Sequence, residues 1–369
     1  MRPSADLASF VMAGFESSTH RRRDGCRLDV TASTLHDRFC DLDYARLRRV
    51  GIGVARESIR WPLVEPRPFV YRFAPLRPMM AAARRHRIQI IWDLCHFGWP
   101  DDLDPFGPAF TDRLAALATA FTRMLAEESE EPPYVVPLNE ISFVAWAGGD
   151  VGYLNPFAIA RGDELKRSLV RGAIAASDAV LSVAPLARLV HVDPVIHIAP
   201  SSSAADDVVA AAGYTASQFE AWDMIAGVRD PGLGGARRYL DIVGANFYPR
   251  NEWVHADEPM DPSHASYRPL RCLLRDLWER YGRPVLVTET GTEDEARAAW
   301  LRRMADEVEA ARADGVPVEG LCLYPVLNHP GWDDDRHCHN GLWDYADGNG
   351  ERAVHAPLLH EVRRIASRT

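Results

Sequence analysis

The chain has 369 residues, of which 47% are hydrophobic and 25% are charged, a composition typical of a globular enzyme. Its formal net charge of -10 argues against nucleic acid or an anionic membrane as a partner and suits a protein that handles neutral small molecules. No Cys-x-x-Cys pair occurs among the six cysteines, so we expect free thiols. The start of the chain has no apolar stretch long enough for a signal peptide, and no membrane-spanning window follows, so we expect a cytoplasmic protein.

Short β-rich runs alternate with segments that place apolar residues at helical spacing, which is the pattern of βαβ units in a parallel sheet. The eight runs are residues 10–15, 54–60, 88–95, 134–139, 189–192, 242–248, 285–289 and 318–326. The clearest helical segments are residues 114–128, 163–183 and 293–313. A doubly wound sheet would usually show a Gly-rich phosphate turn after its first strand, and Gly-Phe-Glu-Ser (14–17) is not one. The sequence therefore predicts an α/β fold of one domain, a (β/α)₈ barrel over residues 1–369.

Two regions depart from this alternation. Residues 194–230 are rich in small residues and serines, which suggests a long loop with a helix, and residues 249–268 are rich in Pro, His and Asp. Both follow predicted strands. We therefore expect them to be βα loops over the carboxyl end of the barrel, where such loops build active sites.

Two glutamates stand at the ends of apolar runs. Glu140 ends Tyr-Val-Val-Pro-Leu-Asn-Glu and Glu289 ends Pro-Val-Leu-Val-Thr-Glu, whereas the similar dipeptides at 251–252 and 292–293 lie in polar, turn-rich stretches. A carboxylate at the end of a buried strand is partly desolvated, which is costly unless a site uses it. Hydrolysis of a glycosidic bond requires two carboxyl groups flanking that bond. We interpret Glu140 and Glu289 as candidates for this pair.

Five segments at predicted strand ends carry further patterns. In chain order they read Val-Ala-Arg-Glu-Ser-Ile-Arg-Trp-Pro (54–62), Leu-Cys-His-Phe-Gly-Trp-Pro (94–100), Leu-Asn-Glu (138–140), Gly-Ala-Asn-Phe-Tyr (244–248) and Val-Thr-Glu-Thr-Gly (287–291). They resemble, in the same order, Tyr-Arg-Phe-Ser-Ile-Ser-Trp-Pro, Leu-x-His-Trp-Asp-Leu-Pro, Asn-Glu-Pro, Gly-x-Asn-Tyr-Tyr and Ile-Thr-Glu-Asn-Gly of the glycoside hydrolase family 1 β-glycosidases. The chain thus resembles a divergent, shortened relative within clan A of the glycoside hydrolases.

This resemblance implies a retaining β-glycosidase that acts by double displacement without a cofactor. Glu289 matches the nucleophile, and Arg56 and Tyr248 match the cation and hydroxyl that stabilise its ionised form. Glu140 matches the acid/base, whose pKa a second carboxylate nearby would raise. Asn139 matches the amide that binds the 2-hydroxyl of the sugar.

Four more positions match sugar-binding positions of the family. His96 matches a neutral donor to a ring hydroxyl, and Asn246 lies in the Gly-x-Asn-Tyr-Tyr segment. Glu16 is the nearest counterpart of a glutamine that binds the 3- and 4-hydroxyls, and Trp332 would stack on the sugar. Arg56 could instead be a structural arginine paired with a neighbouring carboxylate such as Glu57, and Trp92, Phe97 and Trp99 suit either core packing or a sugar-stacking wall.

The chain departs from the family after the eighth strand. The family reads Trp-Ser-Leu-Leu-Asp-Asn-Phe-Glu-Trp there, and this chain reads Tyr-Pro-Val-Leu-Asn-His-Pro-Gly-Trp (324–332). Gly331 replaces the glutamate that grips the 4- and 6-hydroxyls, so glucose specificity cannot be transferred. Residues 333–339 contain Asp, His and Cys side chains that could hold Zn²⁺, but we expect a hydrogen-bonded rim and no metal.

Three alternatives remain open. The same barrel and glutamates could transfer the sugar to an alcohol or natural-product acceptor, which an apolar acceptor subsite of Phe97, Trp99 and Trp146 would favour. The barrel could bind carbohydrate without cleaving it, or the Asp/His loop could support a metal-dependent hydrolase. The sequence does not specify the sugar, its linkage or the oligomeric state.

Overall fold

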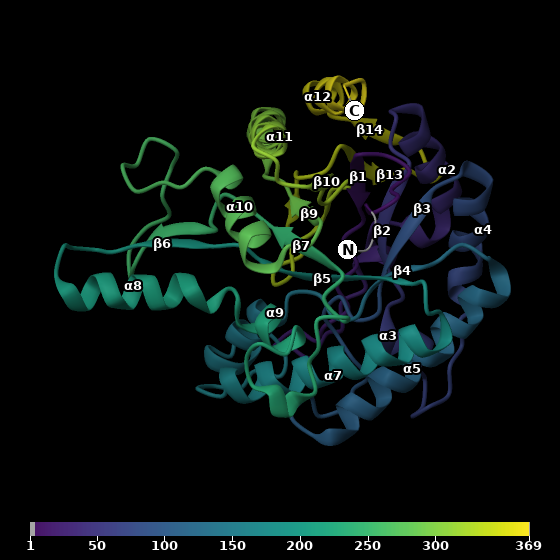
Figure 1. Ribbon diagram of the computed structural model, residues 1–369. Helices are drawn as coiled ribbons and strands as arrows, with labels where there is room; N and C mark the ends of the chain where they lie inside the picture. Colours follow the sequence, from purple (N-terminus) through teal and green to yellow (C-terminus); the bar gives the residue numbers. More distant parts are fainter. Residues whose placement is uncertain (1–3, 369) are drawn as a thin grey trace.

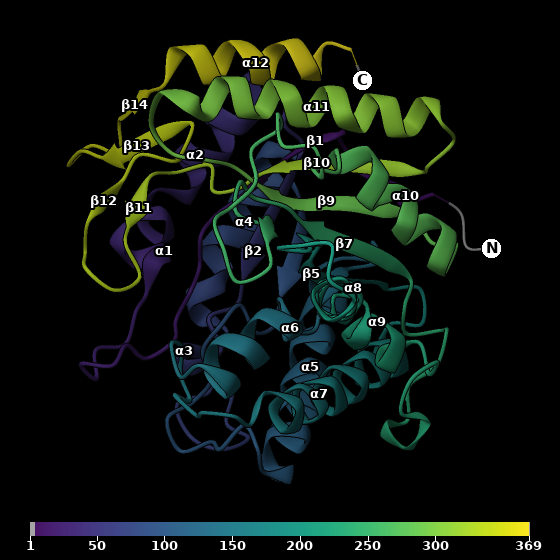
Figure 2. The same ribbon diagram turned by 90° about the vertical axis from the view of Figure 1, so that its left-hand side faces the viewer.

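A computed structural model describes residues 4–368, in which eight parallel strands close into a barrel (Figures 1 and 2). Around the barrel the strands follow the order β1-β10-β9-β7-β5-β4-β3-β2. Their bounds are β1 Val11–Gly14, β2 Val54–Ser58, β3 Gln89–Asp93, β4 Tyr134–Val136, β5 Arg188–Pro194, β7 Ile242–Asn246, β9 Val285–Thr290 and β10 Val318–Leu323. Each of the eight predicted runs overlaps one of these strands, so the predicted (β/α)₈ barrel is confirmed.

Helices surround the barrel on its outside (Figures 1 and 2). The longer ones are α2 His36–Arg49, α4 Arg77–His86, α5 Pro108–Glu128, α7 Gly162–Val183, α10 Leu270–Tyr281, α11 Arg297–Ala313 and α12 Ala356–Ala366. Shorter helices are α1 Val30–Ser33, α3 Trp61–Val64, α6 Ile141–Val144 and α9 Glu220–Ile225. The three clearest predicted helical segments correspond to α5, α7 and α11. None of the helices within residues 4–368 is long and apolar enough to span a membrane.

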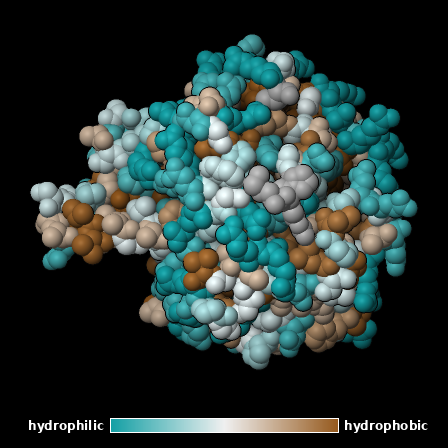
Figure 3. Space-filling model, in the orientation of Figure 1, coloured by the Kyte–Doolittle hydropathy of each residue, from teal (hydrophilic) through white to brown (hydrophobic). Residues whose placement is uncertain are grey.

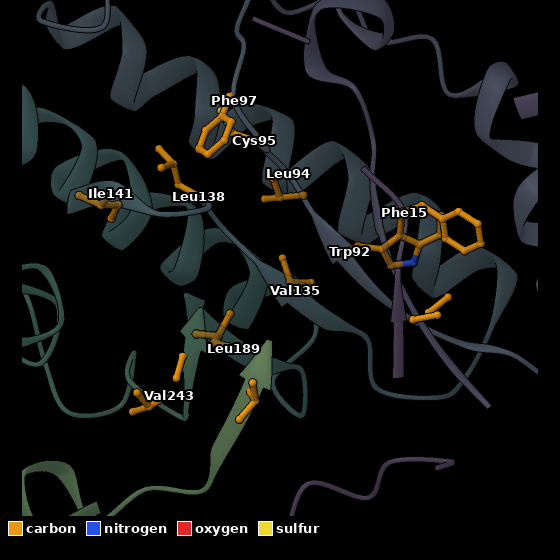
Figure 4. Close-up of a cluster of buried hydrophobic side chains, with 14 of the residues drawn as sticks. Phe15, Trp92, Leu94, Cys95, Phe97, Val135, Leu138, Ile141, Leu189 and Val243 are labelled. Carbon is orange, nitrogen blue, oxygen red and sulfur yellow. The ribbon is translucent and has the colours of Figure 1, made fainter. Parts of the chain in front are cut away.

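The strands separate two apolar clusters because successive side chains of a strand point to opposite faces. Ile91 and Val136 belong to the cluster inside the barrel. Trp92 and Val135 belong to the larger cluster between the strands and the helices, where Figure 4 shows them with Leu189. A one-residue shift of register would exchange these two sets, so the apolar pattern fixes which residues face the barrel interior.

The carboxyl ends of the strands carry the irregular segments of the chain. After β5 and β7 the chain forms β6 His197–Ala199, α8 Ala205–Ser217 and β8 Glu252–Val254, which project from the barrel in Figure 1. We call this set of elements the side arm. The segment after β10 forms two hairpins, β11 His329–Pro330 with β12 His337–Cys338, and β13 Trp343–Ala346 with β14 Arg352–Val354.

A buried ionic network ties the outer face of β2 to α2. His36 Nδ1 lies 2.9 Å from Asp43 Oδ2, and its Nε2 lies 2.9 Å from Glu57 Oε1. Tyr44 donates a 2.8 Å hydrogen bond to the same Glu57 oxygen, and Arg352 binds Asp43. Burial lowers the pKa of His36, but Glu57 and Asp43 outweigh it and raise that pKa to about 9. Glu57 therefore has partners of its own and does not pair with Arg56.

This network predicts a pH-dependent stability. The pKa of His36 is raised on folding, so its stabilising contribution is complete below about pH 6.5 and is lost as the pH rises through about 9. Replacing His36 by Gln leaves the buried Glu57 carboxylate without its cation, while Asp43 keeps Arg46 and Arg352, and should lower the free energy of unfolding by about 3 kcal/mol at pH 6. Urea unfolding of both proteins at pH 6 and pH 9.5 measures this difference. A difference that does not shrink at the higher pH would contradict the assignment.

Candidate active site

Arg56 lies at the centre of the barrel mouth and contacts three other strand ends. Its Nε and Nη2 donate hydrogen bonds of 3.0 and 2.7 Å to the two carboxylate oxygens of Asp93, the last residue of β3. Nη2 also donates to Asn139 Oδ1 at 2.6 Å, and Nη1 donates to Glu289 Oε1 at 2.6 Å. A buried guanidinium requires such partners, because an unpaired charge away from water is strongly destabilising. Arg56 thereby connects β2, β3, β9 and the end of β4.

Glu289 is held by hydrogen bonds to both carboxylate oxygens. Besides Arg56 at Oε1, the hydroxyl of Tyr248 donates a 2.9 Å hydrogen bond to Oε2. A guanidinium and a hydroxyl both favour the ionised form of a carboxyl group. Glu289 is 5% exposed and lines a large cavity.

Glu140 lines the same cavity in a contrasting environment. Asn246 Nδ2 donates a 2.7 Å hydrogen bond to Glu140 Oε1, and Asn246 Oδ1 of the same amide accepts from the hydroxyl of Thr288 at 2.7 Å. Burial raises the pKa of Glu140 well above its usual value, and the negative charges of Glu289 and Asp193 raise it further. The two carboxyl groups therefore differ in their surroundings, since a guanidinium and a hydroxyl donate to Glu289 while burial and negative neighbours favour the neutral form of Glu140.

The backbone at Glu140 is in a left-handed conformation, with φ 50° and ψ 59°. Its amide donates to the carbonyl of Val192 on β5 at 3.0 Å. Two residues later, Ser142 donates from its amide and its hydroxyl to the carboxylate of Asp193, at 2.9 and 2.7 Å. A non-glycine residue persists in this conformation only where the surroundings hold it. The end of β5 supplies that restraint and aims Glu140 into the cavity.

The remaining predicted residues surround this pair. His96 Nδ1 lies 2.6 Å from Asp93 Oδ2, and His96 Nε2 lies 3.0 Å from the Tyr324 hydroxyl. Burial lowers the pKa of His96, but Asp93 and Glu16 outweigh it and raise that pKa overall. Because Asp93 accepts the Nδ1 proton, a neutral His96 would present an acceptor at Nε2. The expectation of a neutral donor therefore does not fit this geometry, and donation from Nε2 requires the imidazolium.

Glu16 and Trp332 both line the cavity. The Glu16 carboxylate accepts hydrogen bonds from the amide and the hydroxyl of Ser18. Burial raises the pKa of Glu16, but His96, His329 and Ser18 outweigh it and lower that pKa overall. Trp332 packs edge-on against Phe97, with ring centroids 5.5 Å apart. A carboxylate and an aromatic ring thus line the same cavity as the two glutamates.

Gly331 lies outside the lining of the cavity, in the turn between β11 and β12, where its amide donates to Arg336 O at 2.7 Å. A side chain at Gly331 would meet the carboxylate of Asp334. His329 and Asn340 line the cavity instead, with Asn340 Nδ2 2.9 Å from His329 Nε2. This pair is a polar contact in the cavity wall close to Gly331 in the sequence.

The 333–339 loop is a hydrogen-bonded rim. Asp333 accepts a 2.6 Å hydrogen bond from the Tyr153 hydroxyl, and His337 pairs with Asp344 at 2.7 Å. Within residues 4–368, no group of three or more His, Cys, Asp or Glu side chains is placed to hold a metal ion. The geometry therefore gives no support to a metal-dependent hydrolase.

Sequence reasoning missed several residues of this site. Asp93 and Asp193 are buried carboxylates at the ends of β3 and β5, and their only signal was an acidic residue in an apolar run. Phe143 and Tyr324 line the cavity without any distinctive spacing. Trp99, by contrast, was expected to line an acceptor subsite but is buried against Phe110, with ring centroids 5.7 Å apart.

Comparison with known proteins places this geometry in context. No protein-family model and no curated protein sequence matches the chain. Among solved structures, a β-glucosidase from Thermotoga maritima in complex with glucoimidazole has a TM-score of 0.78 at 17% identity, covering 99% of this chain and 98% of that one. A family 1 β-glucosidase from the same organism has a TM-score of 0.78 at 16% identity, with 97% of each chain covered. The AHE enzyme from Alicyclobacillus herbarius has a TM-score of 0.79 at 16% identity, with 100% of each covered. The chain shares the fold of family 1 β-glucosidases over nearly its whole length.

The position of Asp193 predicts how Glu140 titrates. Burial raises the pKa of Asp193 to about 7, so above that pH its charge opposes ionisation of Glu140. Asp193→Asn removes the charge while keeping the shape, and the pKa of Glu140 should fall. The ¹³C carboxyl resonance that disappears in Glu140→Gln reports this titration. Ser142→Ala, which keeps the Asp193 carboxyl, serves as the control, and an unchanged titration in Asp193→Asn would contradict the coupling.

Proposed function

We propose that this protein is a retaining β-glycosidase, a divergent relative of the family 1 glycoside hydrolases. The observation that carries the proposal is the opposite environment of two carboxyl groups in one cavity. Glu289 is bound by Arg56 and Tyr248, whereas Glu140 is buried with a raised pKa. One ionised and one protonated carboxyl group are what double displacement requires of its nucleophile and its acid.

The first step of the proposed reaction forms a glycosyl-enzyme. A Glu289 carboxylate oxygen attacks the anomeric carbon, the bond to the leaving oxygen breaks, and Glu140 transfers its proton to that oxygen. His96 lines the cavity and would bind a hydroxyl of the same sugar, and Asn139 is buried behind it, with Asn139 Nδ2 3.4 Å from His96 Nε2. Hydrogen bonds that strengthen as positive charge develops on the ring lower the barrier.

The second step releases the sugar with its original configuration. Glu140, now ionised, takes a proton from water as the water oxygen attacks the anomeric carbon, and the bond to Glu289 breaks. Once the glycosyl ester forms, the Glu289 carboxylate loses its negative charge. The pKa of Glu140 then falls, because the Coulomb repulsion that raised it is removed. The same residue can therefore act as acid first and as base second.

Transfer to an acceptor other than water is the second candidate function. Phe97, Phe143 and Trp146 line the cavity beyond Glu140, and apolar surface there would favour an apolar alcohol over water. Of the three residues expected to form this subsite, Phe97 and Trp146 line the cavity and Trp99 does not. Product analysis with added alcohol distinguishes transfer from hydrolysis.

Removal of the proposed nucleophile tests the mechanism. Glu289→Gly should abolish cleavage of an aryl β-glycoside, and added azide should restore part of it and yield the α-glycosyl azide, because a small anion fits the vacated space. Glu293→Gly is the matched control, since Glu293 follows a threonine in the same way but pairs with Arg336 at the surface. NMR gives the configuration of the azide. A β-azide, or an unaffected rate in Glu289→Gly, would contradict the role of Glu289.

The replacement of the family's glutamate by Gly331 predicts a changed sugar preference. A lost charged hydrogen bond costs roughly 1.5 to 3 kcal/mol, or about 10- to 150-fold in rate when it acts in the transition state. We expect kcat/KM for an aryl β-glucoside to be no higher than for the matching xyloside or fucoside. If His329 and Asn340 replace the glutamate fully, the glucoside will instead be preferred by about tenfold or more, and the effect ascribed to Gly331 is then wrong.

A further inference from the structure

The cavity that contains Glu140 and Glu289 extends from the barrel mouth to the side arm. Its volume is about 1250 Å³, and its lining includes Tyr214 from α8 and Trp253 from β8. Sites for drug-sized ligands usually measure roughly 300 to 1,000 Å³. A single sugar ring at the two glutamates therefore leaves the outer part of the cavity unfilled.

The side arm is built to hold two aromatic rings in place. The Ile198 amide donates to Thr215 Oγ1 at 3.0 Å, and Gln218 bonds to both backbone groups of Ile196 at 3.0 Å. These bonds fix the C-terminal half of α8 against β6. Tyr214 and Trp253 then meet edge to face, with ring centroids 5.4 Å apart at 81°. Both rings line the cavity from the side of the arm.

A second aromatic wall follows directly after Glu140. Phe143 in α6 and Trp146 in the π-helical turn that follows have ring centroids 6.0 Å apart. Trp146 is 44% exposed although it lines the cavity. Large exposed aromatic surface in a cavity usually marks a binding site. Because Glu140 delivers its proton to the leaving oxygen, this wall stands on the leaving-group side of the cleaved bond.

Several charged side chains along this outer part are paired within the protein, while Arg250 and Asp257 also line it. Lys166 Nζ lies 2.6 Å from Glu220 Oε2, and Asp163 pairs with Arg167 at 2.9 Å. Pairing reduces the attraction that these groups would offer to a charged ligand. The aromatic side chains of the two walls are therefore the main groups that a ligand in the outer cavity would contact, and they suit an uncharged, apolar group.

From this geometry we infer that the side arm and the Phe143–Trp146 wall together form an aglycone site, which takes an apolar group substantially larger than a phenyl ring. The inference rests on the proposed function, because it identifies the leaving group of the bond that Glu140 and Glu289 cleave. The substrate class is accordingly a neutral β-glycoside of an extended aromatic or alkyl alcohol. The side arm, which projects from the barrel and shows apolar patches in Figure 3, is then part of the substrate site.

The inference is tested with two substrates, the phenyl and the 4-octylphenyl β-glycoside of the same sugar. The sugar is the one whose aryl β-glycoside the protein cleaves fastest. A para-alkyl chain changes the acidity of the phenol little, so any preference reports binding of the chain. We expect kcat/KM to be higher for the octylphenyl glycoside by roughly tenfold or more, since burial of about two methylene groups is enough for tenfold. Equal values for the two glycosides would overturn the inference and leave the glycosidase proposal standing.

Substitutions in the two aromatic walls show which side chains cause the preference for the octylphenyl glycoside. Trp253→Ala on the arm and Trp146→Ala on the opposite wall should each move the octylphenyl-to-phenyl ratio toward one. Val209→Ala is the matched control, because Val209 lies on α8, is 70% exposed and is outside the cavity lining, and its ratio should equal that of the wild type. Trp146→Ala does not depend on the folding of the arm, so it keeps the test valid if Trp253→Ala disturbs that element. If both tryptophan variants keep the octylphenyl-to-phenyl ratio of the wild type, the assignment is wrong. If the wild type cleaves neither glycoside, the proposed function is wrong as well.

Discussion

The pairing of Arg56 is the interaction on which the rest of the site depends. Its guanidinium is 2% exposed and can be stable there only with partners, which Asp93, Asn139 and Glu289 provide. Because these partners come from β3, the end of β4 and β9, one buried cation fixes the relative positions of three strand ends. Removal of Arg56 would leave two buried carboxylates facing each other without a countercharge. The same contacts that hold the barrel mouth together therefore also place a guanidinium against the Glu289 carboxyl group.

The strand ends around Arg56 give the two carboxyl groups different electrostatic surroundings. The donors to Glu289 include a cation, whereas Glu140 has an amide donor and two carboxylates as neighbours. The difference is produced by tertiary neighbours, since both residues follow similar apolar strands in the sequence. Asp193 contributes twice, because it restrains the backbone after Glu140 through Ser142 and also adds negative charge beside it. The proposed roles of acid and nucleophile thus rest on the positions of the two residues within one charge network.

Much of this architecture could be predicted from the sequence, and the remainder has an identifiable cause. The eight strands were predictable because buried parallel strands are continuous apolar runs, and Glu140 and Glu289 stood out as carboxyl groups that end such runs. Asp93 and Asp193 were missed because Arg56 on β2 and Ser142 in α6, which bind them, are distant in the sequence. The side arm was expected as two loops, one of them with a helix, and its strands were missed because β6 and β8 are short and pair across more than fifty residues of chain. Trp99 was assigned to the cavity together with Phe97. The two residues are separated by one residue in the loop after β3, and the sequence does not show which of the two side chains faces the cavity and which faces the core.

Covalent trapping tests the central claim, that Glu289 is the nucleophile of a double displacement, most directly. A 2-deoxy-2-fluoro β-glycosyl fluoride forms the glycosyl-enzyme quickly but slows its hydrolysis, because the fluorine destabilises the positively charged transition state. After inactivation and proteolysis, mass spectrometry identifies the labelled residue. The account predicts time-dependent inactivation with a single sugar on Glu289. A label on any other residue, or the absence of a covalent adduct together with a product of inverted configuration, would contradict it.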